Sequence, residues 1–141
     1  MGLKGWPMAG EDTKIKYMVV NLLKGEQKSD EYAHLNPQKF VPTLIVNDAK
    51  LSDKPIVLNE SLPICEFLEE AYPETRKLIP ADIVLRFKVR RLCEMINAGI
   101  QPIQNLGVIN EIGARFGQEH KGPWAKWVIE RGFESKCNTL C

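Results

Sequence analysis

FVPTLIV at residues 40–46 and PIVLNESL at residues 55–62 are the two segments that decide the fold. A proline leads a short apolar run, a polar loop follows, and a second short run ends where a helix begins. This order predicts a strand over residues 43–47, a hairpin partner over residues 56–58 and an amphipathic helix from Glu60. Unpaired N–H groups and the positive end of a helix dipole attract anions, so we predict a site for a small peptide carboxylate here.

The composition is that of an ordinary globular protein. The chain has 141 residues, of which 44% are hydrophobic, and 19 Lys and Arg balance 18 Asp and Glu. This balance gives no indication of a nucleic acid or an anionic membrane as partner. No apolar run approaches the roughly 18 residues of a membrane helix, and the first residues are too polar for a signal sequence.

The four cysteines form no CxxC pair and have no histidine at metal-ligand spacing. Their density is also far below that of a disulfide scaffold. We therefore expect no metal site, and we expect free thiols in a reducing compartment, the cytoplasm.

The chain before the first segment is predicted to begin irregularly over residues 1–14. A β-branched and aromatic run predicts a strand over residues 15–23. Ser29 and the acidic residues after it predict a short helix that ends before Pro37. Because residues 43–47 are nearly all apolar, we expect that strand to be covered on both faces.

The second half of the chain is predicted to be all α-helical. Residues 74–80 follow directly after Pro73, hold a second proline and three charged residues, and are interpreted as a linker, which gives domains over residues 15–73 and 81–141. Asp82 is a good N-cap for a long amphipathic helix, and Gly99 and Pro102 are expected to bend that helix rather than end it. Residues 117–123 are predicted as a turn, and Trp124 begins another helix.

Several runs of the sequence resemble the zeta-class glutathione transferases over about residues 15–133. They are NLLKGEQKS (21–29), LNP (35–37), VPTL (41–44), ESL (60–62) and GIQPIQNL (99–106). The last run separates the zeta class from other glutathione transferases. The resemblance implies an α/β plus all-α architecture: an incomplete thioredoxin-like N-terminal domain with its first strand missing, followed by part of the family's helical domain.

The resemblance also implies a reaction. Zeta enzymes use glutathione as co-substrate for the cis–trans isomerisation of maleylacetoacetate to fumarylacetoacetate, a step of tyrosine and phenylalanine catabolism, and the full-length family forms homodimers. Its second substrate is a small unsaturated dicarboxylic acid. Nothing before Ile15 resembles the serine- and cysteine-containing motif that activates the thiol, so we expect no catalytic residue in this chain. The chain also stops about one third short of the family, and residues 48–55 resemble an insertion.

Five glutathione contacts in the first half are implied by the resemblance. The Val41–Pro42 unit, in cis, pairs with the cysteinyl backbone; Glu60 and Ser61 hold the γ-glutamyl unit; and Gln27 contacts the ligand. Each has an ordinary alternative. Pro42 is then a trans proline at a strand start, the residues Asn59, Glu60 and Ser61 only cap a helix, and Gln27 is a solvated glutamine.

Four more contacts are implied in the second half: Gln101, Asn105, Leu106 and Gly107 line the cleft from across the dimer interface. The alternative is a polar helix face beside the Pro102 bend. The family has serine at position 107, so Gly107 departs from the pattern.

Other reactive side chains are not expected to replace the missing motif. Cys65 and Cys93 lie on apolar helix faces and are interpreted as core residues. Tyr17 lies on the predicted strand, His34 on a short surface helix and His120 in a turn.

Two functions follow from the sequence. The first is a zeta-class glutathione transferase that isomerises maleylacetoacetate. The second is a non-catalytic glutathione-transferase-like module that binds partners or dimerises. The thiol-activating motif separates them.

Overall fold

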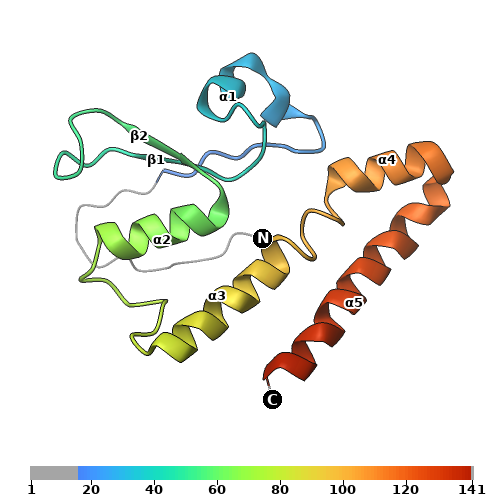
Figure 1. Ribbon diagram of the computed structural model, residues 1–141. Helices are drawn as coiled ribbons and strands as arrows, with labels where there is room; N and C mark the ends of the chain where they lie inside the picture. Colours follow the sequence, from blue (N-terminus) through green and yellow to red (C-terminus); the bar gives the residue numbers. More distant parts are fainter. Residues whose placement is uncertain (1–15, 141) are drawn as a thin grey trace. The chain divides into compact units, whose positions relative to one another are not determined.

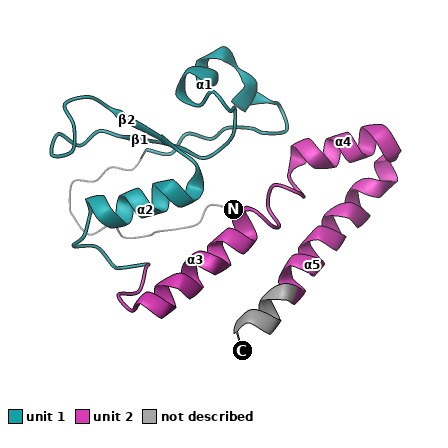
Figure 2. Cartoon of the chain, in the orientation of Figure 1, with its two compact units in different colours: residues 1–78 teal, residues 79–141 magenta. Residues whose placement is uncertain are grey.

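The computed structural model describes residues 16–140, with side chains through Glu134. The chain divides into two compact units, Met1–Leu78 (unit 1) and Ile79–Cys141 (unit 2), shown in two colours in Figure 2. The division falls inside residues 74–80, the segment interpreted as a linker. No helix among the described residues is long and apolar enough to cross a lipid bilayer.

Unit 1 is a β-hairpin flanked by helices. Its elements in chain order are η1 (Glu26–Lys28), α1 (Asp30–Leu35), β1 (Thr43–Val46), β2 (Ile56–Asn59) and α2 (Ser61–Ala71) (Figure 1). The strands are antiparallel, with Thr43 opposite Asn59 and Val46 opposite Ile56. The predicted hairpin and the helix after it are confirmed.

The short helix α1 begins as the sequence predicts. The Tyr32 N–H donates to the Ser29 hydroxyl over 3.2 Å, which satisfies one N–H of the first turn. The helix ends at Leu35, before Pro37. Its bounds therefore follow from local signals alone.

The predicted strand over residues 15–23 is wrong for the part that the structure describes. Residues 16–20 have no strand pairing, and the Val19 side chain is 92% exposed. The chain then turns because Asn21 Oδ1 accepts from the N–H groups of Leu23 and Lys24, each over 3.1 Å. Residues with high strand propensity form a strand only when a neighbouring strand pairs with them. Here the Asx turn at Asn21 provides an alternative conformation. Ile15 and residues 1–14 lie outside the described part.

The prediction that β1 is covered on both faces is also wrong. Ile45 and its cross-strand neighbour Val57 are each 41% exposed. On the other face, Val46 is only 8% exposed, as is Ile64 of α2. The hairpin thus packs one face and leaves the other open, as antiparallel sheets often do.

Unit 2 consists of helices. They are α3 (Ile83–Asn97), α4 (Leu106–Phe116), η2 (Gln118–His120) and α5 (Lys121–Leu140). The Leu85 N–H donates to Asp82 Oδ1 over 2.8 Å, so the predicted N-cap of α3 is confirmed. Ile100 and Val128 are the buried apolar residues of this unit, at 5% and 0% exposure.

The helix predicted to bend at Gly99 and Pro102 ends instead. Helix α3 stops at Asn97, and the N–H groups of Ile100 and Gln101 both bond to Ile96. Pro102 supplies no N–H with which to continue the ladder. Asn105 then caps a new helix, because its Oδ1 accepts from the Leu106 N–H over 2.7 Å.

The turn predicted over residues 117–123 is shorter than expected. Helix α5 begins at Lys121, so Pro123 lies in its first turn, where a missing N–H costs little. The chain leaves α4 at Gly117, whose φ of 112° suits a residue without a side chain.

Candidate functional site

The N-terminus of α2 is open. The first bond of the helix runs from the Ile64 N–H to the Glu60 carbonyl over 3.0 Å, and Pro63 has no N–H. The N–H groups of Ser61 and Leu62 therefore have no partner among the described residues. With the exposed Ser61 hydroxyl, they form a cluster of donors at the positive end of a helix, which suits a carboxylate.

Asn59 and Glu60, which the alternative interpretation treats as caps, do not cap this helix with their side chains. The Glu60 side chain makes no capping hydrogen bond, and its backbone has a φ of 70°. Asn59 is used elsewhere, because its Nδ2 donates to the Leu35 carbonyl over 3.3 Å and its Oδ1 accepts from Thr43 Oγ1 over 3.0 Å. A positive φ on a residue other than glycine is costly and is found most often at functional sites.

A second open feature is the peptide before Pro42. The Val41–Pro42 bond is cis, as the family resemblance implied. Val41 is 43% exposed, and neither its N–H nor its C=O bonds to another described residue. A free N–H and C=O on one extended residue can pair with the backbone of a bound peptide.

The strand register brings these two features to one end of the hairpin. Thr43 lies opposite Asn59 in antiparallel β1 and β2. Val41 precedes Thr43 by two residues, and Ser61 follows Asn59 by two, so both lie just beyond the same end of the ladder. An extended peptide paired with Val41 can therefore present a carboxylate to the start of α2.

The loop that carries Val41 is held by side chains that sequence reasoning did not find. The Phe40 carbonyl accepts from Tyr32 Oη over 2.7 Å and from Asn36 Nδ2 over 2.8 Å. Asn36 is 1% exposed, and its Oδ1 accepts from the Gln38 N–H over 3.0 Å. The dipeptide Asn36–Pro37 is a turn signal, but nothing in it indicates the partner of the amide.

Gln27 lies in η1 and is half-buried, not solvated. Its Oε1 is a buried side-chain oxygen for which the described residues provide no hydrogen-bond partner. On the neighbouring residue, the Lys28 carbonyl accepts from Lys39 Nζ over 3.5 Å. A buried acceptor without a donor is unfavourable unless a ligand or water supplies one.

The remaining four predicted contacts lie in unit 2, around the start of α4. Gln101 is exposed in the turns that precede the helix, and Leu106 is 40% exposed. Asn105 is occupied as the N-cap of α4. A side chain at Gly107 would point into open space, since no atom lies within 4 Å of the position of its Cβ.

The side chains that could replace the thiol-activating motif lie in varied surroundings. Cys93 is half-buried on α3, but the prediction that Cys65 is a core residue is wrong, because its thiol is exposed while the adjacent Ile64 is buried. Tyr17 is 82% exposed, and His34 is exposed on α1. Among the side chains described through Glu134, no group of three metal-ligating residues could hold an ion.

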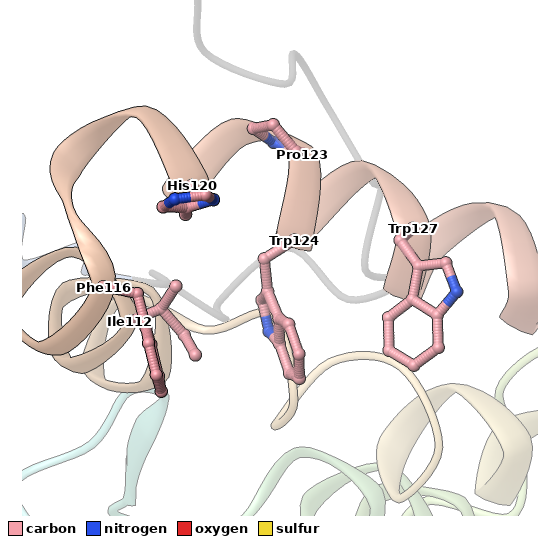
Figure 3. A pocket seen from close by; sticks show the side chains of 6 residues that line it. All are labelled: Ile112, Phe116, His120, Pro123, Trp124 and Trp127. Carbon is pink, nitrogen blue, oxygen red and sulfur yellow. The ribbon is translucent and has the colours of Figure 1, made fainter.

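His120 lies in a different environment, on an apolar hollow of unit 2. The hollow measures about 520 Å³ and is lined by Ile112, Phe116, His120, Pro123, Trp124 and Trp127 (Figure 3). The two indole rings are 5.4 Å apart, and the Trp124 Nε1–H donates to the Ile103 carbonyl over 3.0 Å. Apart from the His120 imidazole and the Trp124 and Trp127 indole N–H groups, the side chains of this lining are apolar.

Comparison with known proteins defines the class. Residues 8–76 match the family model described as the glutathione S-transferase N-terminal domain. Unit 1 therefore carries a glutathione S-transferase N-terminal domain of thioredoxin-like fold, as the sequence predicted. The chain spans about half the length of the curated relatives it matches.

The relatives narrow the class to one branch. A maleylacetoacetate isomerase from Dictyostelium discoideum is 39% identical over 89% of this chain and 55% of its own length, and one from Rattus norvegicus is 41% identical over 82% and 49%. A zeta-class maleyl pyruvate isomerase superposes with a TM-score of 0.73 at 35% identity, over 85% of this chain and 54% of its own. The resemblance is confirmed: this chain is a homologue of the zeta-class glutathione transferases and maleylacetoacetate isomerases.

One further solved relative was crystallised with ligand. A maleylacetoacetate isomerase from Anaeromyxobacter dehalogenans, with glutathione bound in its active site, superposes with a TM-score of 0.70 at 34% identity, over 84% of this chain and 53% of its own.

Proposed function

We propose that this protein acts as a maleylacetoacetate isomerase of the zeta class and that unit 1 provides its glutathione site. The observation that carries the proposal is the unpartnered N-terminus of α2, which lies at the same end of the hairpin as the free Val41 peptide. The proposal places the glutathione-binding domain over residues 15–73 and a helical domain over residues 81–141. It includes a cytoplasmic homodimer.

Glutathione is an extended tripeptide with a carboxylate at each end and an ammonium group beside the γ-glutamyl carboxylate. In the proposed complex, the Ser61 hydroxyl and the N–H groups of Ser61 and Leu62 bind that carboxylate. The Glu60 carboxylate pairs with the ammonium group, and the N–H and C=O of Val41 pair with the cysteinyl backbone, Pro42 following in cis. The buried Gln27 Oε1 accepts a hydrogen bond from a ligand N–H.

The residues of unit 1 named above are proposed to bind glutathione and so to orient its thiol. In the reaction proposed for the whole protein, the glutathione thiolate adds to the conjugated double bond of the substrate, rotation follows about the resulting single bond, and the thiolate leaves. Gln101, Asn105, Leu106 and Gly107 are proposed to line the substrate side of the cleft. We assign thiol activation to no residue of the described part, since the free donors described at the hairpin end are the ones proposed to bind the γ-glutamyl carboxylate and the cysteinyl backbone.

The proposal is tested by calorimetric titration of the chain with glutathione and by turnover of maleylacetoacetate. Ser61→Ala removes one hydrogen bond to a charged group, which is expected to weaken binding about 10- to 100-fold. Ser52→Ala, in the polar loop of the same hairpin, is the matched control and should bind as wild type. If wild-type chain neither binds glutathione nor turns over substrate, the proposal is wrong.

The second candidate is a glutathione-binding module without catalysis. It is favoured because, among the side chains described through Glu134, the free donors at the hairpin end are already assigned to the carboxylate and backbone of glutathione. Glutathione binding without turnover of maleylacetoacetate would support this candidate, whereas turnover would exclude it.

A further inference from the structure

We propose that the side chains of Tyr32, Asn36, Thr43 and Asn59, named here the Phe40 clamp, position the Val41 N–H for the bound peptide. These are positioning residues: they act through the backbone of Phe40 and do not touch the ligand. The inference rests on the proposed glutathione site. It adds the side chains that orient the Val41 N–H, the group proposed to bind the cysteinyl backbone.

The clamp acts on a single carbonyl. Tyr32 Oη and Asn36 Nδ2 lie 2.7 Å and 2.8 Å from the Phe40 oxygen, so both lone pairs of that oxygen are engaged from the side of α1. Asn36 is 1% exposed, and its own Oδ1 is fixed by the Gln38 N–H. The Asn36 amide is therefore held in place by a bond that does not involve the Phe40 carbonyl.

Peptide geometry transmits this restraint to Val41. The Phe40 C=O and the Val41 N–H belong to one planar peptide unit, and in a trans peptide the two bonds point in opposite directions. The cis bond of this loop is the next one along the chain, between Val41 and Pro42. A carbonyl held against α1 therefore directs the Val41 N–H away from α1, where it meets no other described residue.

The same network reaches the start of α2. Tyr32 Oη also lies 2.9 Å from Thr43 Oγ1, which lies 3.0 Å from Asn59 Oδ1. Asn59 directly precedes Glu60 and Ser61, so the carboxylate end of the proposed site is tied to its central contact. The Asn59 amide is oriented by the bond from its Nδ2 to the Leu35 carbonyl.

A count of hydrogens shows where the clamp depends on Tyr32. The hydroxyls of Tyr32 and Thr43 make three contacts: Tyr32 with Phe40 O, Thr43 with Asn59 Oδ1, and the two hydroxyls with each other. Each hydroxyl contributes one hydrogen, so only two hydrogens serve these three contacts. Two of the three are bonded at any moment. The tyrosine hydroxyl is the one group that takes part in both the carbonyl bond and the link to β1, so removing it weakens the clamp without removing a buried side chain.

The test compares two tyrosines of unit 1. Tyr32→Phe deletes the clamp hydroxyl, and Tyr72→Phe deletes a hydroxyl that donates to Asp48 Oδ2 over 3.1 Å, away from Val41. The two variants lose the same atom: Tyr32→Phe loses the contacts with Phe40 O and Thr43 Oγ1, and Tyr72→Phe loses the bond to Asp48, so the pair compares the loss of a tyrosine hydroxyl at the clamp with the same loss elsewhere in unit 1. Asn36→Ala is not used alone, because it would leave the turn over residues 36–39 unsupported.

Two measurements are made on the full chain. The first is the NMR order parameter of the Val41 amide without ligand, which is expected to fall from about 0.85 to below about 0.6 in Tyr32→Phe and to stay unchanged in Tyr72→Phe. The second is the dissociation constant for glutathione, which should rise about 3- to 10-fold in Tyr32→Phe, the size of one lost hydrogen bond, and less than about 2-fold in Tyr72→Phe.

The possible outcomes distinguish a failure of the Phe40 clamp from a failure of the proposed glutathione site. An unchanged Val41 order parameter in Tyr32→Phe, or equal loss of affinity in both variants, would overturn the clamp while leaving the glutathione site intact. Wild-type chain that shows no glutathione binding would overturn the proposed function, and the ligand part of this inference with it. A looser Val41 amide together with weaker binding in Tyr32→Phe alone supports the positioning role.

Discussion

Asn36 in unit 1 and Val128 in unit 2 are buried to nearly the same degree, at 1% and 0% exposure, yet they stabilise their units in different ways. The Asn36 amide bonds two backbone groups and so fixes the direction of a loop. Val128 has no polar side-chain atom, and its burial contributes through the removal of apolar surface from water. Substitutions in unit 1 should therefore change geometry at the site, whereas those in unit 2 should change stability.

Unit 2 also contains a closely packed contact between helix α5 and Ile100. A Cβ on Gly132 would lie 2.3 Å from Cγ1 of Ile100, so α5 approaches this buried side chain where it has no side chain of its own. In unit 1, by contrast, the hairpin leaves Ile45 and Val57 exposed on one face. The apolar contacts of unit 2 are thus the more sensitive to a change of volume.

The largest effect is expected from Ile100→Ala. Truncation of this residue, which is 5% exposed, should lower the free energy of unfolding of unit 2 by about 2–5 kcal/mol, because it removes apolar burial and leaves a cavity. Urea unfolding followed by the fluorescence of Trp124 and Trp127 measures it. Ile96→Ala is the control, since Ile96 is 44% exposed, and should cost less than about 1 kcal/mol.

The close contact between Gly132 and Ile100 allows a second test by a double variant. Gly132→Ala adds a methyl group into the space that Ile100→Ala empties, so the double variant should be less destabilised than the sum of the two. The expected coupling is about 0.5–3 kcal/mol. Strict additivity would show that α5 does not pack on Ile100 as described.

The next effect is the loss of a helix cap. Asp82→Ala removes the acceptor for the Leu85 N–H and should destabilise unit 2 by about 1 kcal/mol. Urea midpoints and helical circular dichroism measure the change. Asp53→Ala, in the exposed hairpin loop, should stay within about 0.5 kcal/mol of wild type; a similar loss in both would indicate a general charge effect.

A smaller effect of opposite sign is expected at Glu60. Glu60→Gly relieves a backbone with a φ of 70° and should stabilise unit 1 by roughly 1 kcal/mol, even though glycine adds entropy to the unfolded chain. Binding of glutathione should weaken in the same variant because the carboxylate is lost. Glu60→Gln keeps the strained backbone, so it should weaken binding without raising stability, as measured by calorimetry and hydrogen exchange.

The smallest effect is a pH dependence in unit 1. Burial, followed by the hydrogen bond to Asp48, raises the pKa of Tyr72 above its usual value of about 10. The folded state therefore holds this proton more tightly than the unfolded state does. Its contribution to stability is present in full below pH of about 10 and is lost as the pH rises through the folded pKa.

Urea midpoints between pH 8 and pH 11 in wild type and Tyr72→Phe give the measurement. Stability of wild type should fall more steeply above pH of about 10 than that of the variant. Parallel curves would show that Tyr72 does not titrate differently in the folded state.

Much of the fold could be predicted because its signals are local. Ser29 and Asp82 cap helices α1 and α3, and the proline-led apolar runs form the hairpin. The wrong predictions share a cause, because each depended on hydrogen-bond partners that the local sequence does not specify. The run from residue 16 has strand propensity but no pairing partner among the described residues. The helix expected to bend at Pro102 ends at Asn97, where the Ile96 carbonyl accepts the N–H groups of both Ile100 and Gln101.

For the candidate site, the sequence by itself determined the residue types that make a proline-led strand and a helix predicted from Glu60, because these signals span only a few positions. The tertiary structure alone decided that the start of α2 is left uncapped and that Phe40 is held by Tyr32 and Asn36. The physical reason is that hydrogen bonds are directional and join residues from different elements. Their partners follow from how the chain brings α1, β1 and β2 together, and no short motif records that arrangement.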